Sequence, residues 1–135
     1  MNFTRRSLLG MAAAAPLAMA APATAVKLGI DLFSLRSQGW TPFQLLDYSA
    51  KLAAKVVHFS EIRFIGTLEP ENLRAVRRYA EERGIEIEIG MRSICPTSKM
   101  FDAKAGTAEE QIGRMLDSAT LAGSRIVRAV LGSSE

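Results

Sequence analysis

Residues 85–92 read Ile-Glu-Ile-Glu-Ile-Gly-Met-Arg, and this stretch decides the fold. Its odd positions are apolar, while the even positions hold Glu86, Glu88, Gly90 and Arg92. A period of two sends successive side chains to opposite faces of a strand, so the pattern predicts a β-strand over residues 85–94. We expect the apolar face of this strand to pack on helices and the other face to point into the interior of a barrel.

Working outward, three more short runs rich in apolar and β-branched residues predict strands, at residues 26–35, 55–62 and 126–131. Helical patterns separate the strands. Capping boxes at Thr41 and Thr107 begin two helices, and Pro70 begins a third with acidic residues in its first turn. Between the third strand and its helix we expect a long loop over residues 95–106, either a lid at the strand ends or a plain surface excursion.

Four strands alternating with three helices, in units of about 30 residues, are typical of a parallel sheet built from right-handed crossovers. The prediction is therefore an α/β fold, the first half of a (β/α)8 TIM barrel, whose usual length is roughly 250 residues. In such barrels the functional residues lie at the carboxyl ends of the strands.

The first 25 residues are predicted to be an export signal and not part of the fold, which leaves residues 26–135 as the partial barrel domain. Arg5 and Arg6 precede a weakly apolar run that is too short to span a bilayer, and the segment ends in small residues at Ala23-Thr24-Ala25. The twin arginines favour a twin-arginine signal peptide and a periplasmic protein, with an ordinary secretory signal as the alternative.

The charge and the cysteine content of the sequence exclude several classes of function. Arg5 and Arg6 are the only charged residues in 1–25, so removal of the signal reduces the net charge from +3 to +1. A nearly neutral domain argues against nucleic-acid binding, and no remaining segment is long and apolar enough for a membrane helix. Cys95 is the single cysteine, so the chain has no internal disulfide; we expect its thiol to be buried, with a free thiol as the alternative.

Arginines come near the ends of all four predicted strands. Arg36 follows the first strand, Arg63 and Glu61 end the second, Arg92 ends the third, and Arg128 lies on the fourth. Guanidinium groups gathered at one barrel mouth would hold a phosphate, carboxylate or hydroxyl-rich ligand through paired hydrogen bonds. The alternative is that these are loop arginines paired with Glu61, Asp102 or solvent.

His58 is the only histidine, and it lies mid-strand between Val57 and Phe59. If those neighbours face the helices, His58 faces the barrel interior, where it would contact a sugar or lie near a metal. The alternative is a core histidine with its hydrogen bonds satisfied. Glu86 and Glu88 share the inward side of the third strand and are candidates for an acid–base pair or for ion pairs with nearby cations; Glu88 is the better candidate because it is closer to the strand end.

These strand segments resemble the sugar phosphate isomerase/epimerase family, the xylose-isomerase-like TIM barrels. The resemblance covers nearly all of residues 27 to 132 and is carried by residues 28–35, 57–61, 86–91 and 125–132. It implies a barrel that binds a divalent metal (Mn, Mg, Co or Zn) and that isomerises or epimerises a sugar or sugar phosphate through an enediolate.

The family's metal-binding and proton-transferring acids come mainly from strands that follow the fourth. The resemblance therefore implies a fragment that is inactive alone, with no catalytic residue and no metal assigned within it. The candidate substrate-binding residues are Arg36, His58, Glu61, Glu88, Arg92 and Arg128. The rival hypothesis is an exported, non-catalytic carbohydrate-binding α/β module. The half-barrel hypothesis expects self-association through exposed strand edges, whereas the rival module is either a complete small open sheet or a half-barrel that pairs with itself.

Overall fold

A four-stranded parallel sheet organises the chain, in the computed structural model, which describes residues 26–132. The strand order is β1-β2-β3-β4, so each strand pairs with its neighbours in the sequence. This order requires a crossover after every strand, and helices supply it, as expected for repeated strand-helix units. The predicted α/β class and the parallel sheet are thus confirmed, and the topology is compatible with half of a barrel.

The elements occur in the order predicted, with additions at the strand ends. They are β1 (Gly29–Asp31), η2 (Leu32–Leu35), α1 (Pro42–Lys51), β2 (Val56–Phe59), α2 (Ile62–Ile65), α3 (Pro70–Glu81), β3 (Glu86–Ser93), η3 (Ala103–Ala105), α4 (Ala108–Ala122) and β4 (Val127–Val130). The three expected helices are α1, α3 and α4. Residues 1–25, on which the export-signal prediction rests, lie outside the described residues.

Both predicted capping boxes form. The Thr41 hydroxyl accepts the Gln44 amide at 3.3 Å, and the Gln44 side chain accepts the Thr41 amide at 3.0 Å. Thr107 and Glu110 repeat the arrangement at 3.2 and 2.8 Å. Each box satisfies two amides that the first turn of a helix leaves without partners, which fixes where α1 and α4 begin.

The first two predicted strands were too long. Residues 32–35 form the 3-10 helix η2, because the Asp31 carboxylate accepts the Phe33 amide at 2.9 Å and so caps a helical turn at the end of the strand. The second strand ends at Phe59, and Ile62–Ile65 form the short helix α2, which buries Phe64 and Ile65. The buried apolar residues of η2 and α2 therefore pack into the core from helical turns and not from strands.

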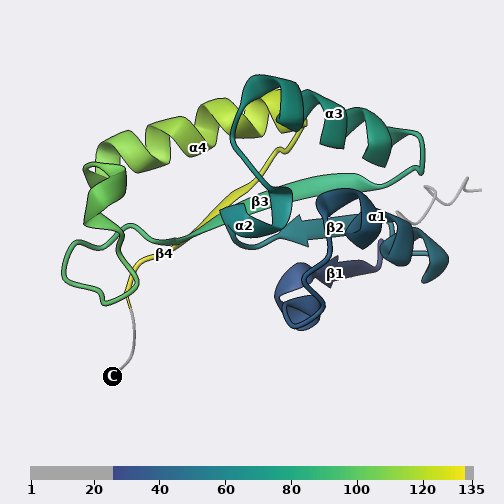
Figure 1. Ribbon diagram of the computed structural model, residues 1–135, viewed down its shortest axis with the longest axis horizontal. Coiled ribbons are helices and arrows are strands. Elements are labelled where there is room, and N and C mark those ends of the chain that lie inside the picture. The colour runs from purple at the N-terminus through teal and green to yellow at the C-terminus, as the bar shows by residue number, and fades with distance from the viewer. Residues whose placement is uncertain (1–25, 133–135) are drawn as a thin grey trace, which may run out of the picture.

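The hydrophobic core lies between one face of the sheet and the helices. Figure 1 shows α3 and α4 along one side of the sheet. The apolar alternation of β2 and β3 points to that side, where Val57, Phe59, Ile87 and Ile89 are buried. They join buried residues of α1, α3 and α4 in one cluster: Leu45, Leu46, Leu73, Val76 and Met115. The opposite face of the sheet is left to polar side chains.

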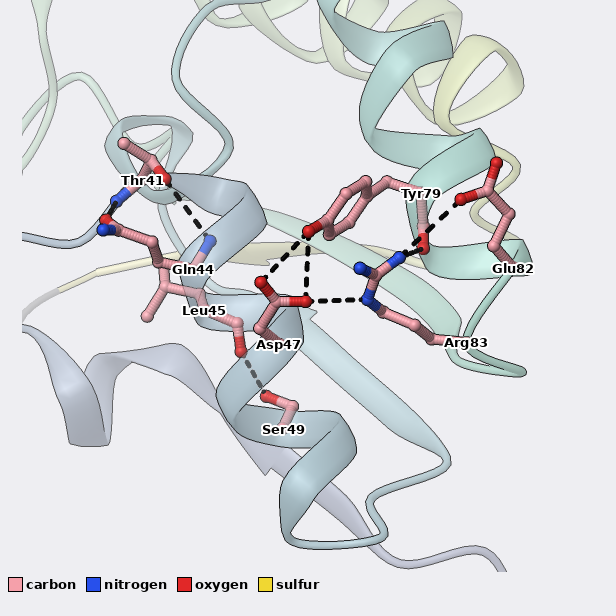
Figure 2. A network of polar contacts seen from close by, with 8 residues as sticks. All are labelled: Thr41, Gln44, Leu45, Asp47, Ser49, Tyr79, Glu82 and Arg83. Atoms are coloured by element: carbon pink, nitrogen blue, oxygen red, sulfur yellow. Dashed lines mark hydrogen bonds and ion pairs between the residues drawn. The ribbon is translucent and has the colours of Figure 1, made fainter.

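A polar clamp joins α1 to α3 at the edge of this core (Figure 2). The Tyr79 hydroxyl donates to the Asp47 carboxylate at 3.0 Å, and the Arg83 Nε donates to the same carboxylate at 2.9 Å. The Arg83 guanidinium also stacks 3.4 Å above the Tyr79 ring. The hydrogen bond from Arg83 is the main cause of a lowered pKa at Asp47, so the clamp is strongest when that carboxylate is charged.

Candidate functional site

The polar face of the sheet carries a row of side chains in register across three strands. Asp31 on β1 pairs with His58 on β2, and His58 pairs with Glu88 on β3. Residues in register on parallel strands point to the same face, so the three side chains stand next to one another on the face opposite the helices. The prediction that His58 and Glu88 share this face, opposite Val57 and Ile87, agrees with their burial pattern.

Arg128 on β4 reaches across β3 to His58. Its Nε donates a hydrogen bond to His58 Nε2 at 2.9 Å, and its Nη2 lies 3.4 Å from the Ser60 carbonyl oxygen. The strand it crosses holds Gly90, the register partner of Arg128. A Cβ at Gly90 would lie 3.1 Å from His58 Nε2 and 3.2 Å from the Arg128 carbonyl oxygen. The absence of a side chain at Gly90 is therefore what lets the arginine and the histidine meet.

The contact with Arg128 selects the neutral form of His58. Because Nε2 accepts a hydrogen bond, the ring proton lies on Nδ1, which faces Glu88 Oε2 at 3.5 Å. Burial is the main cause of a lowered His58 pKa, and the positive Arg128 lowers it further, while Asp31 and Glu88 act in the opposite direction. His58 is thus a neutral side chain held between a cation and two carboxylates.

The buried Nδ1 has no hydrogen-bond partner among the described residues. The Glu88 carboxylate is near it but does not meet the geometry of a hydrogen bond. A donor that is close to a carboxylate and still free is suited to a ligand hydroxyl that bridges the two groups.

Asp31 is exposed at the end of β1, and its carboxylate is charged. Burial raises its pKa, but the nearby Ser60 hydroxyl and the Phe33 amide oppose this, and the net pKa is below its usual value. The positive charge of Arg128 contributes in the same direction. The Ser60 hydroxyl lies beside the carboxylate without meeting the geometry of a hydrogen bond, so it too is buried without a partner in the described part of the chain.

A β-bulge shapes the carboxyl end of the sheet. Between the register pairs Gly90–Arg128 and Ser93–Val130, β3 has two residues, Met91 and Arg92, where β4 has one. The extra residue redirects the side chains at this point, as bulges near binding sites often do. Arg92 is exposed and Met91 is buried, and both line the space at the strand ends.

This space, which we call the strand-end cleft, has a volume of about 230 Å³. Its lining comes from β1, β3 and β4, from the segments that follow β1 and β2, and from the loop after β3: Asp31, Phe33, Ser60, Glu61, Met91, Arg92, Met100, Arg128 and Val130. A second cleft of about 270 Å³ shares Glu61, Met91, Arg92 and Met100 and extends between α2 and the start of α4. The loop over residues 95–106 thus contributes Met100 to the cleft, in keeping with a loop at the functional end of the sheet.

The structure gathers some of the predicted site residues and separates others. Glu61, Arg92 and Arg128 line the strand-end cleft, and His58 and Glu88 stand behind Arg128 on the sheet face. Arg36 follows η2 and not the strand, donates to the Phe33 carbonyl oxygen at 2.9 Å, and lines a different pocket beside Trp40. Arg63 lines that pocket too, so of the four arginines predicted to share one mouth the strand-end cleft gathers Arg92 and Arg128 but not Arg36 or Arg63.

Several alternatives left open by the sequence are now decided. Glu61 forms an ion pair with Arg63 at 2.9 Å, which is the pairing considered for the loop arginines. Glu86 is exposed and pairs with Lys27, so it does not act with Glu88. Cys95 is only half-buried, against expectation, because it lies in the loop after β3; a hydrogen bond with the Thr97 hydroxyl lowers its pKa.

Asp31, Ser60 and Gly90 belong to this site but were not predicted for it. Asp31 was hidden by the prediction of a strand through residue 35, which obscured that the strand ends at this residue. Ser60 was hidden in the same way, because the second strand was predicted to continue through residue 62. The signal that identifies both is their position: a polar residue at or directly after the last residue of a strand.

The described residues do not fit a divalent metal. Among residues 26–132, no three His, Cys, Asp or Glu side chains are grouped so as to hold an ion. His58 and Glu88 are close, but the guanidinium of Arg128 occupies His58 Nε2 and places a positive charge beside the pair. We therefore assign no metal ligand and derive no chemical step through a metal.

In comparisons with known proteins, no family model matches the chain, and none of the curated proteins matches it significantly. No helix within the described range combines the length and apolar character needed to cross a membrane. The site geometry is therefore the basis on which a function is proposed.

Proposed function

We propose that residues 26–132 are the first half of a (β/α)8 barrel in an exported, periplasmic sugar isomerase or epimerase, and that this half binds the sugar or sugar phosphate substrate. The observation that carries the proposal is the polar row Asp31–His58–Glu88 with Arg128 crossing to it. A charged acceptor, a neutral ring donor and a cation on one sheet face are the groups that recognise a polyhydroxylated ligand.

The open sheet face supports the barrel part of the proposal. Parallel sheets are normally covered on both faces, whereas the described elements cover one. Residues on the uncovered face have the mixed charges of a binding site, and the strand-end cleft opens at the carboxyl ends of the strands, where barrel enzymes bind substrate. The export route and the enediolate chemistry rest on the resemblances alone.

A non-catalytic carbohydrate-binding module is the second candidate, and one observation favours it. His58 Nε2 is engaged by Arg128, and a cation at that position disfavours the protonated ring. His58 is therefore a poor proton carrier and a good hydrogen-bond donor, which suits binding better than proton transfer. Under the isomerase proposal, the proton-transferring groups come from strands beyond β4.

Saturation-transfer NMR of the chain with D-xylose, D-xylulose and D-fructose tests the shared claim. We expect all three to bind, more weakly after Asp31→Asn or Arg128→Gln and unchanged after Arg74→Gln, an exposed control on α3. No binding by any of these sugars would reject both candidates. Incubation with the ketoses in D2O is a one-way test: deuterium uptake at the carbon next to the carbonyl requires an enediolate and would eliminate the binding module. The isomerase proposal expects no uptake from these four strands alone, because its proton-transferring groups come from strands beyond β4.

A further inference from the structure

We propose that His58 is a positioning residue that controls where the Arg128 guanidinium lies. The neutral ring holds Arg128 on the sheet face, and the protonated ring releases it toward Asp31 in the strand-end cleft. The contact is thus a proton-operated switch, in which acid places a cation on a carboxylate that otherwise accepts ligand hydroxyls. The effect on a ligand rests on the proposed function, whereas the movement of Arg128 does not.

The hydrogen bond between the two side chains exists only while the ring is neutral. Arg128 Nε donates to His58 Nε2 at 2.9 Å, and a guanidinium has no acceptor atom to offer in return. Protonation of Nε2 would therefore bring two N–H donors and two positive charges together at this distance, and repulsion would replace the hydrogen bond.

The groups that face the ring favour departure of Arg128 and not of His58. Asp31 on β1 and Glu88 on β3 are the register partners of His58, and Glu88 Oε2 lies 3.5 Å from Nδ1. Burial and Arg128 oppose protonation of the ring, whereas Asp31 and Glu88 favour it. The charged ring would therefore keep two carboxylates beside it, and Arg128 would have lost its acceptor.

Arg128 has a short path to the cleft. It is exposed, its Nη2 already lies 3.4 Å from the Ser60 carbonyl oxygen, and it lines the cleft together with Asp31. Within residues 26–132, no ion pair joins Arg128 to Asp31 while the ring is neutral. Asp31 is thus an anion within the same cleft that the freed guanidinium can pair with.

Asp31 stays charged while His58 titrates. Burial raises the pKa of Asp31, but the Ser60 hydroxyl, the Phe33 amide and the nearby positive charge bring it below 3.8. The switch therefore operates between this value and the usual histidine pKa of 6.5. An ion pair with Arg128 would occupy the acceptor oxygens of Asp31, so a ligand hydroxyl that needs them should bind less tightly in acid.

NMR of the full chain, labelled with ¹⁵N, tests the switch from about pH 8 to about pH 4. At the upper end we expect a scalar coupling between Arg128 Nε and His58 Nε2, which only an intact hydrogen bond transmits. The coupling should disappear, and the Arg128 Hε shift should move, with the midpoint of the ring. Arg83 is the internal control, because its Nε donates to Asp47, whose pKa lies below 3.8.

Two variants show whether the ring is the cause. In His58→Gln an amide oxygen that does not titrate takes the place of the acceptor, so the Arg128 Hε shift should be constant over this range. Glu88→Gln removes a charge that favours the protonated ring, so it should move the midpoint to lower pH. A coupling that survives protonation, an Arg128 movement that persists in His58→Gln, or a ring that stays neutral down to pH 4 would overturn the proposal.

Binding of D-xylose at the two ends of the pH range tests the effect on a ligand. We expect affinity about tenfold lower with the ring protonated, as for loss of a hydrogen bond to a charged group, and no such loss in His58→Gln. Equal affinity at both ends, with Arg128 released, would overturn the link between the switch and the cleft. Absence of binding at every pH would reject the proposed function and that link, while the coupling experiment still decides the movement of Arg128.

Discussion

Arg128 and His58, 70 residues apart in the sequence, are joined by a 2.9 Å hydrogen bond that passes over Gly90. The bond links β4 to β2 across the strand between them, which backbone pairing cannot do. It also decides the chemistry of the histidine, because an Nε2 atom that accepts from a guanidinium cannot carry a proton. One contact thus braces the sheet face and keeps His58 a donor toward Glu88.

Arg128→Gln should raise the pKa of His58. The substitution removes a positive charge beside the ring, whereas Asp31 and Glu88, which favour the protonated form, remain. Burial, the largest cause of the lowered pKa, is not removed, so the rise should be partial. The imidazole nitrogen and proton shifts followed by NMR as a function of pH measure it, with Arg125→Gln as a control off the contact. A pKa that is unchanged or lower would contradict the electrostatic account.

Gly90→Ala should destabilise the fold by about 1–3 kcal/mol, as expected for overpacking at a site with little room to adjust. The new Cβ would lie 3.1 Å from the Ser60 carbonyl oxygen and 3.2 Å from that of Arg128, and backbone atoms cannot easily move away. Urea denaturation followed by circular dichroism gives the free energy of unfolding.

Gly113→Ala on α4 is the matched control for this prediction. A Cβ at Gly113 meets nothing within 4 Å, so alanine should instead stabilise the helix by about 0.5–1 kcal/mol. Equal effects at the two glycines would show that close approach across β3 is not what matters at Gly90.

Much of this architecture is predictable from local sequence. Period-two alternation located β3 and assigned its faces, and the Thr41 and Thr107 capping boxes located the starts of α1 and α4. These features are encoded within a few residues. The strand ends at Asp31 and Phe59 were missed, because apolar residues that follow a strand look the same whether they continue it or turn into a helix toward the core.

The site was less predictable, for a different physical reason. Alternation along each strand predicts which side chains share a face of the sheet, and it predicted correctly that His58 and Glu88 lie on the same face. Which side chains meet across strands depends on register, on the bulge at Met91 and Arg92, and on the open space at Gly90. These are properties of the assembled sheet, so the meeting of Arg128 with His58 and the separate place of Arg36 had no local signal.

The Asp47 clamp should make stability fall in acid. The pKa of Asp47 is below 3.8 in the folded chain, mainly because of its hydrogen bond from Arg83, so the contribution is complete above the unfolded value and is lost as pH falls below about 3.8. Asp47→Asn should therefore lower the free energy of unfolding at pH 7 and flatten its acid dependence. Urea titrations at a series of pH values measure this slope. An unchanged slope in the variant would assign the acid sensitivity to other carboxylates.

His58 should add a second pH dependence at higher pH. Its pKa is below 6.5 in the folded chain, mainly through burial, so the neutral ring favours folding above the unfolded value and this contribution is lost as pH falls through the folded pKa. His58→Gln should remove that component of the stability profile and leave the acid limb assigned to Asp47. The same titrations detect it, and a variant profile that keeps its slope between pH 6.5 and the acid limb below about 3.8 would contradict the assignment.

The two edges of the sheet should make the chain self-associate. Within residues 26–132 each edge strand pairs on one side only, and large apolar side chains flank both: Leu28 near β1 is 75% exposed, and Leu131 after β4 is 74% exposed. Unpaired backbone groups beside exposed apolar residues favour pairing with another chain, and a lysine at such an edge opposes it.

Sedimentation velocity over a range of concentrations should therefore show association that Leu28→Lys or Leu131→Lys weakens. Leu116→Lys is the matched control, since Leu116 is 54% exposed but lies on α4, away from either edge. A single monomeric species at every concentration, or an equal effect of the control, would show that the edges do not drive assembly.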